Sequence, residues 1–340
     1  MPEIPSLKKA IEILHLGSDL KTPYSRNVGP LLESTPALLP MLAGTEYRIN
    51  GLSTECDFLM CFQTCDLKSL SRALMLRRQN SDRLIAQIVN ACNLCCENLR
   101  VVSMFDHIWF ECDAEPSNSL SIFLGTDYNG NLCVSQKELL KVATALDLLE
   151  SLYSVTEGRQ RVYGVANSII QELGGCAICE VGFMGRAGEE AHVKLLMASD
   201  DSISKEVFLE RCRRLSQELD VVLSKTYVSG FLETILSYDC AIHLSASIYA
   251  KKQKYALEFK PAYDPDQAER YCSFWNTIRD VLKIRTDADW MNTAFAAAQP
   301  HNNVVRVSSR LHHIKLFAED TGELGIKVYR DLRTEPSFLS

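Results

Sequence analysis

Two segments of the chain place a histidine two residues before a lysine. They are His192-Val-Lys194 and His313-Ile-Lys315, and both lie in apolar runs with the alternating pattern of a β-strand. Side chains two residues apart on a strand point to the same face. Each segment therefore presents an imidazole beside an ammonium group, a combination suited to binding an anionic ligand.

Two further pairs repeat this spacing, Glu258 with Lys260 and Lys327 with Tyr329. If the strands converge, the lysines repel one another unless an anion neutralises them. Such a site favours a multiply charged ligand, with phosphate or diphosphate the best candidates, and tyrosine and histidine add neutral hydrogen bonds. The alternative is that each lysine reaches the edge of the sheet or faces water.

Known phosphate-binding motifs are absent from the sequence. There is no GxxxxGK[ST] loop, no GxGxxG between a strand and a helix, and no aspartate-rich DDxxD segment. Side-chain cations must therefore do most of the binding of any diphosphate. The two CxxC pairs, Cys92 with Cys95 and Cys176 with Cys179, fit packed thiols, or a zinc site if both pairs converge.

The elements that position these residues recur along the chain. Hairpins of two strands open near Glu46, His107, Cys176, Ala241 and His312, roughly 60 to 70 residues apart. Helical patterns fill the spacers, which have room for two helices each. This order predicts an α+β fold of five ββαα repeats, in which ten antiparallel strands close into a barrel with the helices outside.

The two faces of these strands differ in composition. In residues 107–113, Ile108 and Phe110 alternate with Trp109 and Glu111. If the apolar face packs on the helices, the mixed face lines a solvated chamber, although an open sheet with one face in water gives the same alternation. The aromatic residues assigned to the mixed face are Trp109, Tyr249, Tyr255, Phe317 and Tyr329.

Composition limits the classes of partner. A net charge of -7 argues against nucleic acid, which is bound by basic surfaces. No apolar run reaches the length of a membrane span, and the N-terminus lacks a signal-peptide pattern, so we expect a cytoplasmic protein that does not bind membranes. We expect one domain over residues 1–340, with residues 1–42 as an N-terminal helical segment packed on it.

Five repeats of two strands and two helices, with lysine and tyrosine on the inward faces, resemble the aromatic prenyltransferases of the ABBA or PT-barrel class, which includes indole and cyanobactin-peptide enzymes. The segment RLHHIKLFAEDTGELGIKVYRDL looks like the last hairpin of that class. The resemblance implies a prenyltransferase that moves an allyl group from an isoprenoid diphosphate to an aromatic small molecule or a peptide side chain, in natural-product biosynthesis. It implies no required cofactor, with Mg²⁺ as an optional ion.

The resemblance also implies roles for individual residues. An acidic residue on an early strand, Glu111 or alternatively Glu46, orients or deprotonates the acceptor. Trp109, Tyr249, Tyr255 and Phe317 form the pocket that shields the carbocation from water. The implied diphosphate ligands are Lys194, Lys260, Lys315, Lys327 and Tyr329, together with His192 and His313.

The sequence departs from the prenyltransferase pattern at three points. The strand LSIFLG has no arginine, Lys194 is followed by Leu196 where a tyrosine is expected, and Glu258 lies beside the expected cation Lys260. These departures support a rival hypothesis. In it, the chain is a non-catalytic accessory protein that keeps the barrel and binds a peptide or another partner.

Overall fold

The structure is a computed structural model of the 340-residue chain. It describes residues 6–9, 28–36, 40–50, 53–77, 83–112, 120–126, 135–153, 158–174, 176–185, 190–199, 203–228, 230–238, 240–261, 276, 299–301 and 305–336.

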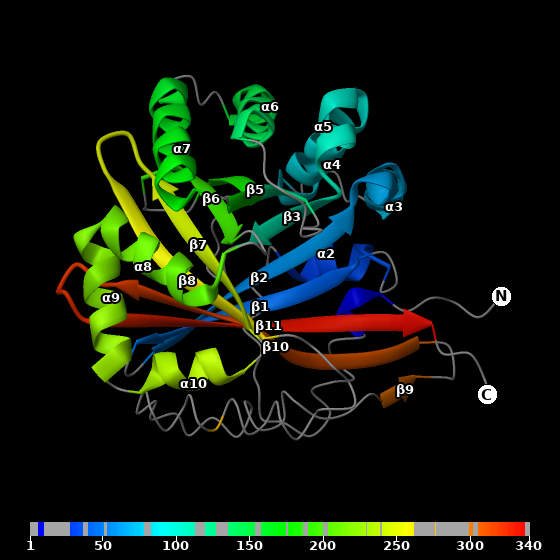
Figure 1. Ribbon diagram of the computed structural model, residues 1–340. Coiled ribbons are helices and arrows are strands. Elements are labelled where there is room, and N and C mark those ends of the chain that lie inside the picture. Colours follow the sequence, from blue (N-terminus) through cyan, green and yellow to red (C-terminus); the bar gives the residue numbers. More distant parts are fainter. Residues whose placement is uncertain are drawn as a thin grey trace.

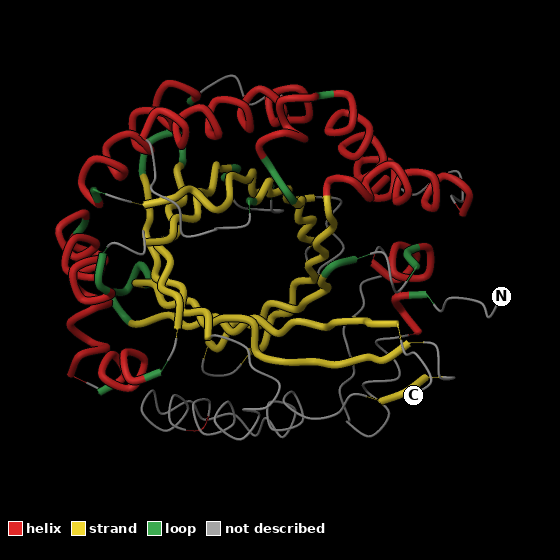
Figure 2. The backbone as a smooth tube through the Cα atoms, turned by 45° about the vertical axis from the view of Figure 1, so that its right-hand side comes forward, coloured by secondary structure: helices red, strands yellow, loops and turns green. Residues whose placement is uncertain are grey.

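The described strands belong to one antiparallel sheet. Its order is β11-β1-β2-β3-β4-β5-β6-β7-β8-β10-β9, and β10 also pairs with β11. The sheet curls so that its strands surround the middle of the molecule (Figure 2). The strands are β1 (Leu42–Asn50), β2 (Ser53–Gln63), β3 (His107–Cys112), β4 (Leu120–Gly125), β5 (Cys176–Met184), β6 (His192–Ser199), β7 (Cys240–Ile248), β8 (Gln253–Pro261), β9 (Gln299–His301), β10 (Val305–Ala318) and β11 (Leu324–Pro336).

Helices follow β2, β4 and β6 and lie on the outside of the sheet (Figures 1 and 2). The prediction of an α+β chain with a curled antiparallel sheet and external helices is therefore confirmed. The helices predicted after β8 fall in residues 262–298, of which the structure describes residue 276 alone. The helices are α2 (Val28–Ser34), α3 (Leu67–Arg77), α4 (Arg83–Glu97), α5 (Leu99–Met104), α6 (Ser135–Tyr153), α7 (Arg159–Leu173), α8 (Lys205–Leu215), α9 (Gln217–Val228) and α10 (Phe231–Ser237).

The hydrophobic core lies between the helices and the outer face of the sheet. In β3, Ile108 and Phe110 are fully buried there, while Trp109 between them is partly exposed on the opposite face. Helix α4 supplies Ile88 and Cys92 to the same core. Burial of each such side chain contributes about 1.5–3 kcal/mol to folding. This burial is why one face of each strand must be apolar.

The cysteines of the two CxxC pairs are all buried. Burial raises the pKa of Cys95 to about 12 and that of Cys179 to about 12, because a thiolate loses its hydration there. Cys92 and Cys95 pack in the core between α4 and the sheet. The thiols act as small apolar side chains in both pairs.

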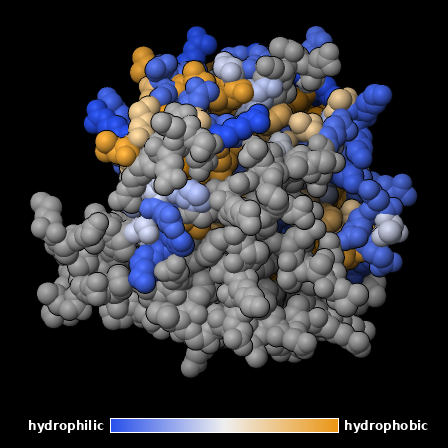
Figure 3. Space-filling model, turned by 180° about the vertical axis from the view of Figure 1, so that it is seen from behind, coloured by the Kyte–Doolittle hydropathy of each residue, from blue (hydrophilic) through white to orange (hydrophobic). Residues whose placement is uncertain are grey.

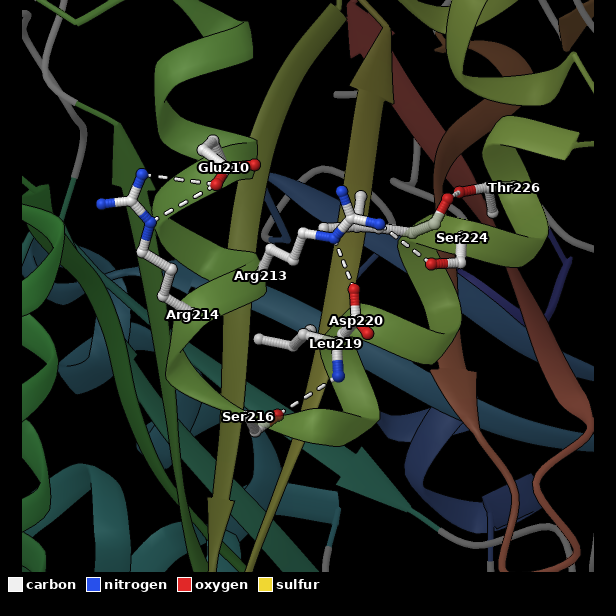
Figure 4. Close-up of polar contacts among 9 residues, drawn as sticks. Glu210, Arg213, Arg214, Ser216, Leu219, Asp220, Ser224 and Thr226 are labelled. Carbon is white, nitrogen blue, oxygen red and sulfur yellow. Dashed lines mark hydrogen bonds and ion pairs between the residues drawn. The ribbon is translucent and has the colours of Figure 1, made fainter.

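Polar contacts hold α8 against α9 at the bend between them (Figure 4). The hydroxyl of Ser216 accepts a hydrogen bond of 3.2 Å from the backbone N–H of Leu219 and so caps α9. Arg213 pairs with Asp220 and donates to the Ser224 hydroxyl at 3.0 Å. This bend turns the chain back along the sheet toward β7.

The described part of residues 1–42 contacts the core. Leu7, Leu31 and Leu32 are buried within it, and Leu7 N–H donates to Thr35 O at 2.8 Å. Much of the predicted N-terminal helical segment lies outside the described residues.

The described surface mixes hydrophilic and hydrophobic side chains when seen from behind (Figure 3). Leu76 on α3 and Leu99 on α5 are strongly exposed. Among the described residues, no helix combines the length and the apolar character that crossing a membrane requires.

Candidate active site on the inner face of the sheet

The inner face is the side of the sheet that points away from the helices. Strand register sets its residues, because directly paired residues project to the same side. His243 of β7 pairs with Glu258 of β8, Glu258 pairs with Lys315 of β10, and Lys315 pairs with Lys327 of β11. Four neighbouring strands therefore bring four titratable side chains into one row.

Glu258 is the hub of this row. Its Oε1 lies 3.2 Å from Lys315 Nζ and 3.6 Å from Lys194 Nζ, and its Oε2 lies 3.4 Å from His313 Nε2. Desolvation raises the pKa of a buried carboxyl, but Lys194 and Lys315 outweigh this effect and hold the pKa of Glu258 well below its ordinary value. Glu258 is therefore an ionised internal partner of both lysines.

The two lysines at the hub differ in their titration. Desolvation, reinforced by Lys194, lowers the pKa of Lys315 to about 7, although its ammonium also donates to Ser245 Oγ at 2.9 Å. Desolvation acts on Lys194 too, but Glu258, Glu111 and other carboxylates raise its pKa above the ordinary value. Lys194 therefore stays a cation in the folded protein, whereas burial makes the positive charge of Lys315 more costly to hold.

A second ion pair joins Lys327 of β11 to Glu46 of β1, with 2.5 Å between Nζ and Oε1. The phenol of Tyr329 hydrogen-bonds to Glu46, and desolvation together with this carboxylate raises the pKa of the phenol. The Tyr329 ring stacks on His313, with centroids 3.7 Å apart and planes at 19°. Desolvation lowers the pKa of His313 to about 3, so its imidazole is neutral.

A β-bulge in β5 brings in Glu180, which the sequence reading missed. The register with β6 shifts between Ile178 and Glu180. At the bulge, the Glu138 carboxylate of α6 accepts from Ile178 N–H at 2.6 Å, and the Lys141 ammonium donates to Ile178 O at 3.2 Å and to Glu138 at 3.0 Å. Desolvation raises the pKa of Glu180 to about 7, against the lowering effect of Lys194.

A second bulge, between Leu311 and His313 of β10, brings in His312. Its Nδ1 lies 2.7 Å from Nδ1 of His313. Its ring lies 5.9 Å from the ring of Trp109 on β3, a strand that does not pair with β10, so the contact crosses the inner space. The sequence reading missed His312 because strict alternation assigns it to the outer face.

Aromatic rings cover glycines on neighbouring strands of this face. A Cβ atom built on Gly182 would lie 2.0 Å from the ring of Phe123, its cross-strand partner. Lys194 Nζ lies 5.3 Å from the centroid of the Phe123 ring, within the range of a cation–π interaction. Rings lie over glycine in the same way at the pairs His107 with Gly125 and Phe317 with Gly325.

Most of the predicted site residues lie on this face, and they form two groups. Lys194, Lys315, Lys327, His313, Tyr329 and Glu46 are joined by the contacts above, and Glu111 is buried near Lys194. Phe317 lies on the same face two positions after Lys315, and Trp109 of β3 lies on the inner face opposite His312. His192 and Tyr249 stack on each other with centroids 4.2 Å apart where β6 begins and β7 ends.

Two predicted residues are not among those joined by the contacts above. Tyr255 packs in the helix-facing core, and its backbone N–H donates to Glu218 of α9 at 3.2 Å. Its assignment to the aromatic lining is wrong, because it lies three positions before Glu258 and an odd spacing on a strand reverses the face. Lys260 is exposed, but its charge acts on three titratable groups of the inner face, Glu180, His243 and His313.

The charge argument from the sequence also needs correction. The buried lysines do not require an external anion, because Glu258 and Glu46 already supply negative charge within 3.6 Å of their ammonium groups. In the sequence, Glu258 was visible beside Lys260 and Glu46 as a candidate acidic residue, but neither could be recognised there as a counter-ion of a lysine. Which cations Glu258 neutralises depends on the order of β6, β8 and β10 in space.

No family model matches the chain, and no curated protein matches it in sequence. Solved structures do match. The crystal structure of the prenyltransferase NotF in complex with brevianamide F and DMSPP is 11% identical, and the match covers 88% of this chain and 81% of that one with a TM-score of 0.50. The fold of this chain is similar to that of the aromatic prenyltransferases. The predicted resemblance is confirmed at this level.

Two further matches have lower TM-scores. The 5-dimethylallyltryptophan synthase from Streptomyces coelicolor is 12% identical, with 96% of this chain and 97% of that one covered and a TM-score of 0.49. AnaPT from Neosartorya fischeri is also 12% identical, with 85% and 77% covered and a TM-score of 0.48.

Proposed function

We propose that the chain is a prenyltransferase that moves an allyl group from an isoprenoid diphosphate to an aromatic small molecule or a peptide side chain, in natural-product biosynthesis. The observation that carries the proposal is the meeting of Lys194, Lys315 and Lys327 on the inner face of a fold similar to NotF. The structure of NotF holds a compound named DMSPP and the aromatic compound brevianamide F. Buried ammonium groups are the side chains that a leaving diphosphate needs.

The reaction assigns one task to each group. The carbon–oxygen bond of the allylic diphosphate breaks, and its electron pair leaves with the diphosphate between Lys194, Lys315 and Lys327. Aromatic rings such as Trp109 shield the allyl cation from water until the acceptor forms its new bond. Glu111 then takes the proton that the acceptor loses.

Glu46 has a different role in this proposal from Glu111. Its ion pair with Lys327 and its hydrogen bond with Tyr329 hold both groups on the inner face. Tyr329 and His313 add neutral contacts to the diphosphate, and His192 with Tyr249 borders the acceptor. The indole Nε1 of Trp109 is buried without a hydrogen-bond partner among the described residues, which suits contact with a bound ligand.

The proposal includes the architecture that this chemistry needs. The ten strands β1 to β8, β10 and β11 form a closed barrel, an inference supported by the pairing of β10 with both β8 and β11. Residues 1–340 form one domain of a cytoplasmic protein, and residues 1–42 pack on the barrel. The reaction requires no cofactor and tolerates Mg²⁺.

Turnover is the direct test. Purified protein is incubated with dimethylallyl, geranyl or farnesyl diphosphate and a panel of indoles, phenols and peptides, and products are identified by mass spectrometry. Lys194→Ala and Lys315→Ala should each reduce turnover by about 100-fold, because each removes a charge from the leaving diphosphate. The matched control is Lys225→Ala on α9, which removes an exposed lysine paired with Glu323.

Absence of product for every donor and acceptor, from protein with a cooperative unfolding transition, contradicts the proposal. It then supports the second candidate, a non-catalytic barrel that binds a peptide or another partner. The specific observation in favour of that candidate is Glu258, whose carboxylate already contacts two of the three lysines. Saturable peptide binding without product formation is the result expected for it.

A further inference from the structure

Lys194 and Lys315 aim their ammonium groups at the same carboxylate oxygen. Oε1 of Glu258 lies 3.6 Å from the first and 3.2 Å from the second, and the Glu258 side chain is almost fully buried. An anion that contacts both ammonium groups at once must occupy the position between them that Oε1 of Glu258 fills. Two oxygens cannot occupy that space, so ligand and Glu258 compete for it.

The charges of the inner face also oppose the binding of an anion. The carboxylates of Glu46, Glu111, Glu180 and Glu258 interact electrostatically with Lys194. The positive charge of the buried lysines is therefore already balanced within the chain. A diphosphate brings at least two further negative charges to a site where Glu258 and Lys315 are buried, and like charges repel strongly in such an environment.

We propose that Glu258 is a specificity-determining residue that lowers the affinity of the lysine cluster for multiply charged phosphate anions by acting as its internal counter-ion. The inference rests on the proposed function for its biological meaning, since diphosphate binding matters only if diphosphate is the donor group. Its physical content is independent of turnover. Removing the negative charge at position 258 should make the inner face a stronger diphosphate site.

Glu258→Gln is the informative substitution because glutamine keeps the size of the side chain and removes its charge. The probe is inorganic diphosphate, and its dissociation constant is measured by isothermal titration calorimetry at constant ionic strength. Compared with the wild type, Glu258→Gln should bind inorganic diphosphate at least about tenfold more tightly. Adding Lys194→Ala should abolish this gain, because the gain depends on the Lys194 ammonium, which no longer pairs with a carboxylate in Glu258→Gln.

Two control substitutions distinguish the direct contact of Glu258 with the lysines from the general effect of removing a negative charge. Glu323→Gln removes an exposed carboxylate that pairs with Lys225, and it should leave the dissociation constant unchanged. Glu180→Gln removes a carboxylate that acts on Lys194 only through the electrostatic field, so its effect should be smaller than that of Glu258→Gln. An equal gain from Glu180→Gln would contradict a specific role for Glu258.

The inference is overturned if folded Glu258→Gln binds inorganic diphosphate with the wild-type dissociation constant. Should this variant not fold, Glu258→Ala replaces it. Alanine also removes the negative charge and leaves the space of the carboxylate open, so an unchanged dissociation constant is again the refuting result. A gain in diphosphate binding without turnover of any prenyl donor supports the inference and contradicts the proposed function, whereas turnover without a gain does the reverse.

Discussion

Glu138→Ala is expected to destabilise the protein strongly, although Glu138 lies outside the candidate active site. Its carboxylate accepts from the N–H of Ile178 at 2.6 Å and from the Lys141 ammonium at 3.0 Å, and both charged side chains are buried. The substitution leaves the Lys141 ammonium without its counter-ion, with the carbonyl of Ile178 still accepting from it, and leaves the Ile178 N–H without its acceptor. Breaking a buried ion pair from one side costs about 3–5 kcal/mol in the free energy of unfolding.

Urea unfolding followed by circular dichroism measures this loss, with Lys141→Met and the double variant completing a cycle. Lys141→Met alone also leaves a buried charge unpaired and should cost a similar amount. The double variant removes both charges and should therefore lose clearly less than the two single losses combined. Two results would show that the ion pair between Glu138 and Lys141 does not hold the bulge. One is a loss in the free energy of unfolding below about 1 kcal/mol for Glu138→Ala, and the other is additivity of the losses in the cycle.

Two further predictions concern the inner face. Because the pKa of Glu180 rises from 4.5 to about 7 on folding, the folded protein holds a proton in this window that the unfolded chain releases, and the free energy of unfolding falls by about 1–3 kcal/mol as pH rises through it. Glu180→Gln should abolish that fall in urea unfolding measured across the window, and an unchanged pH profile contradicts the assignment. Gly182→Ala places a methyl group 2.0 Å from the Phe123 ring and should lower the free energy of unfolding by about 1–3 kcal/mol. Gly164→Ala in α7 is its control, since the new methyl group meets no atom within 4 Å and should stabilise the helix by up to about 1 kcal/mol; equal effects of the two substitutions would contradict the role of the ring.

Alternation along the strands made most of the inner face predictable. A period of two is imposed by the geometry of the backbone, so Lys315 and Lys327 could be assigned to one face without a structure. The same rule, applied strictly, excludes Tyr255 from that face. The error there came from grouping aromatic residues by type rather than by position.

Bulges and strand order set the limit of that prediction. A bulge inserts one residue and reverses the alternation beyond it, so neither Glu180 nor His312 could be assigned from spacing alone. The bulge in β5 depends on a contact from elsewhere in the chain, because the N–H of Ile178 donates to Glu138 of α6. The ion pairs of Glu258 likewise join β8 to β6 and β10, and the order of these strands in the sheet cannot be deduced from spacing along the chain.

The rings that lie over glycines have a consequence for redesign. At Phe123 with Gly182 and at Phe317 with Gly325, one strand supplies all of the side-chain volume and its neighbour supplies none. Replacing the aromatic residue of such a pair with alanine therefore creates a cavity bordered by the backbone of the neighbouring strand. The apolar layer under the helices is not changed by this substitution. The width of the interior can therefore be changed at chosen points, one ring at a time, through substitutions on the inner face alone.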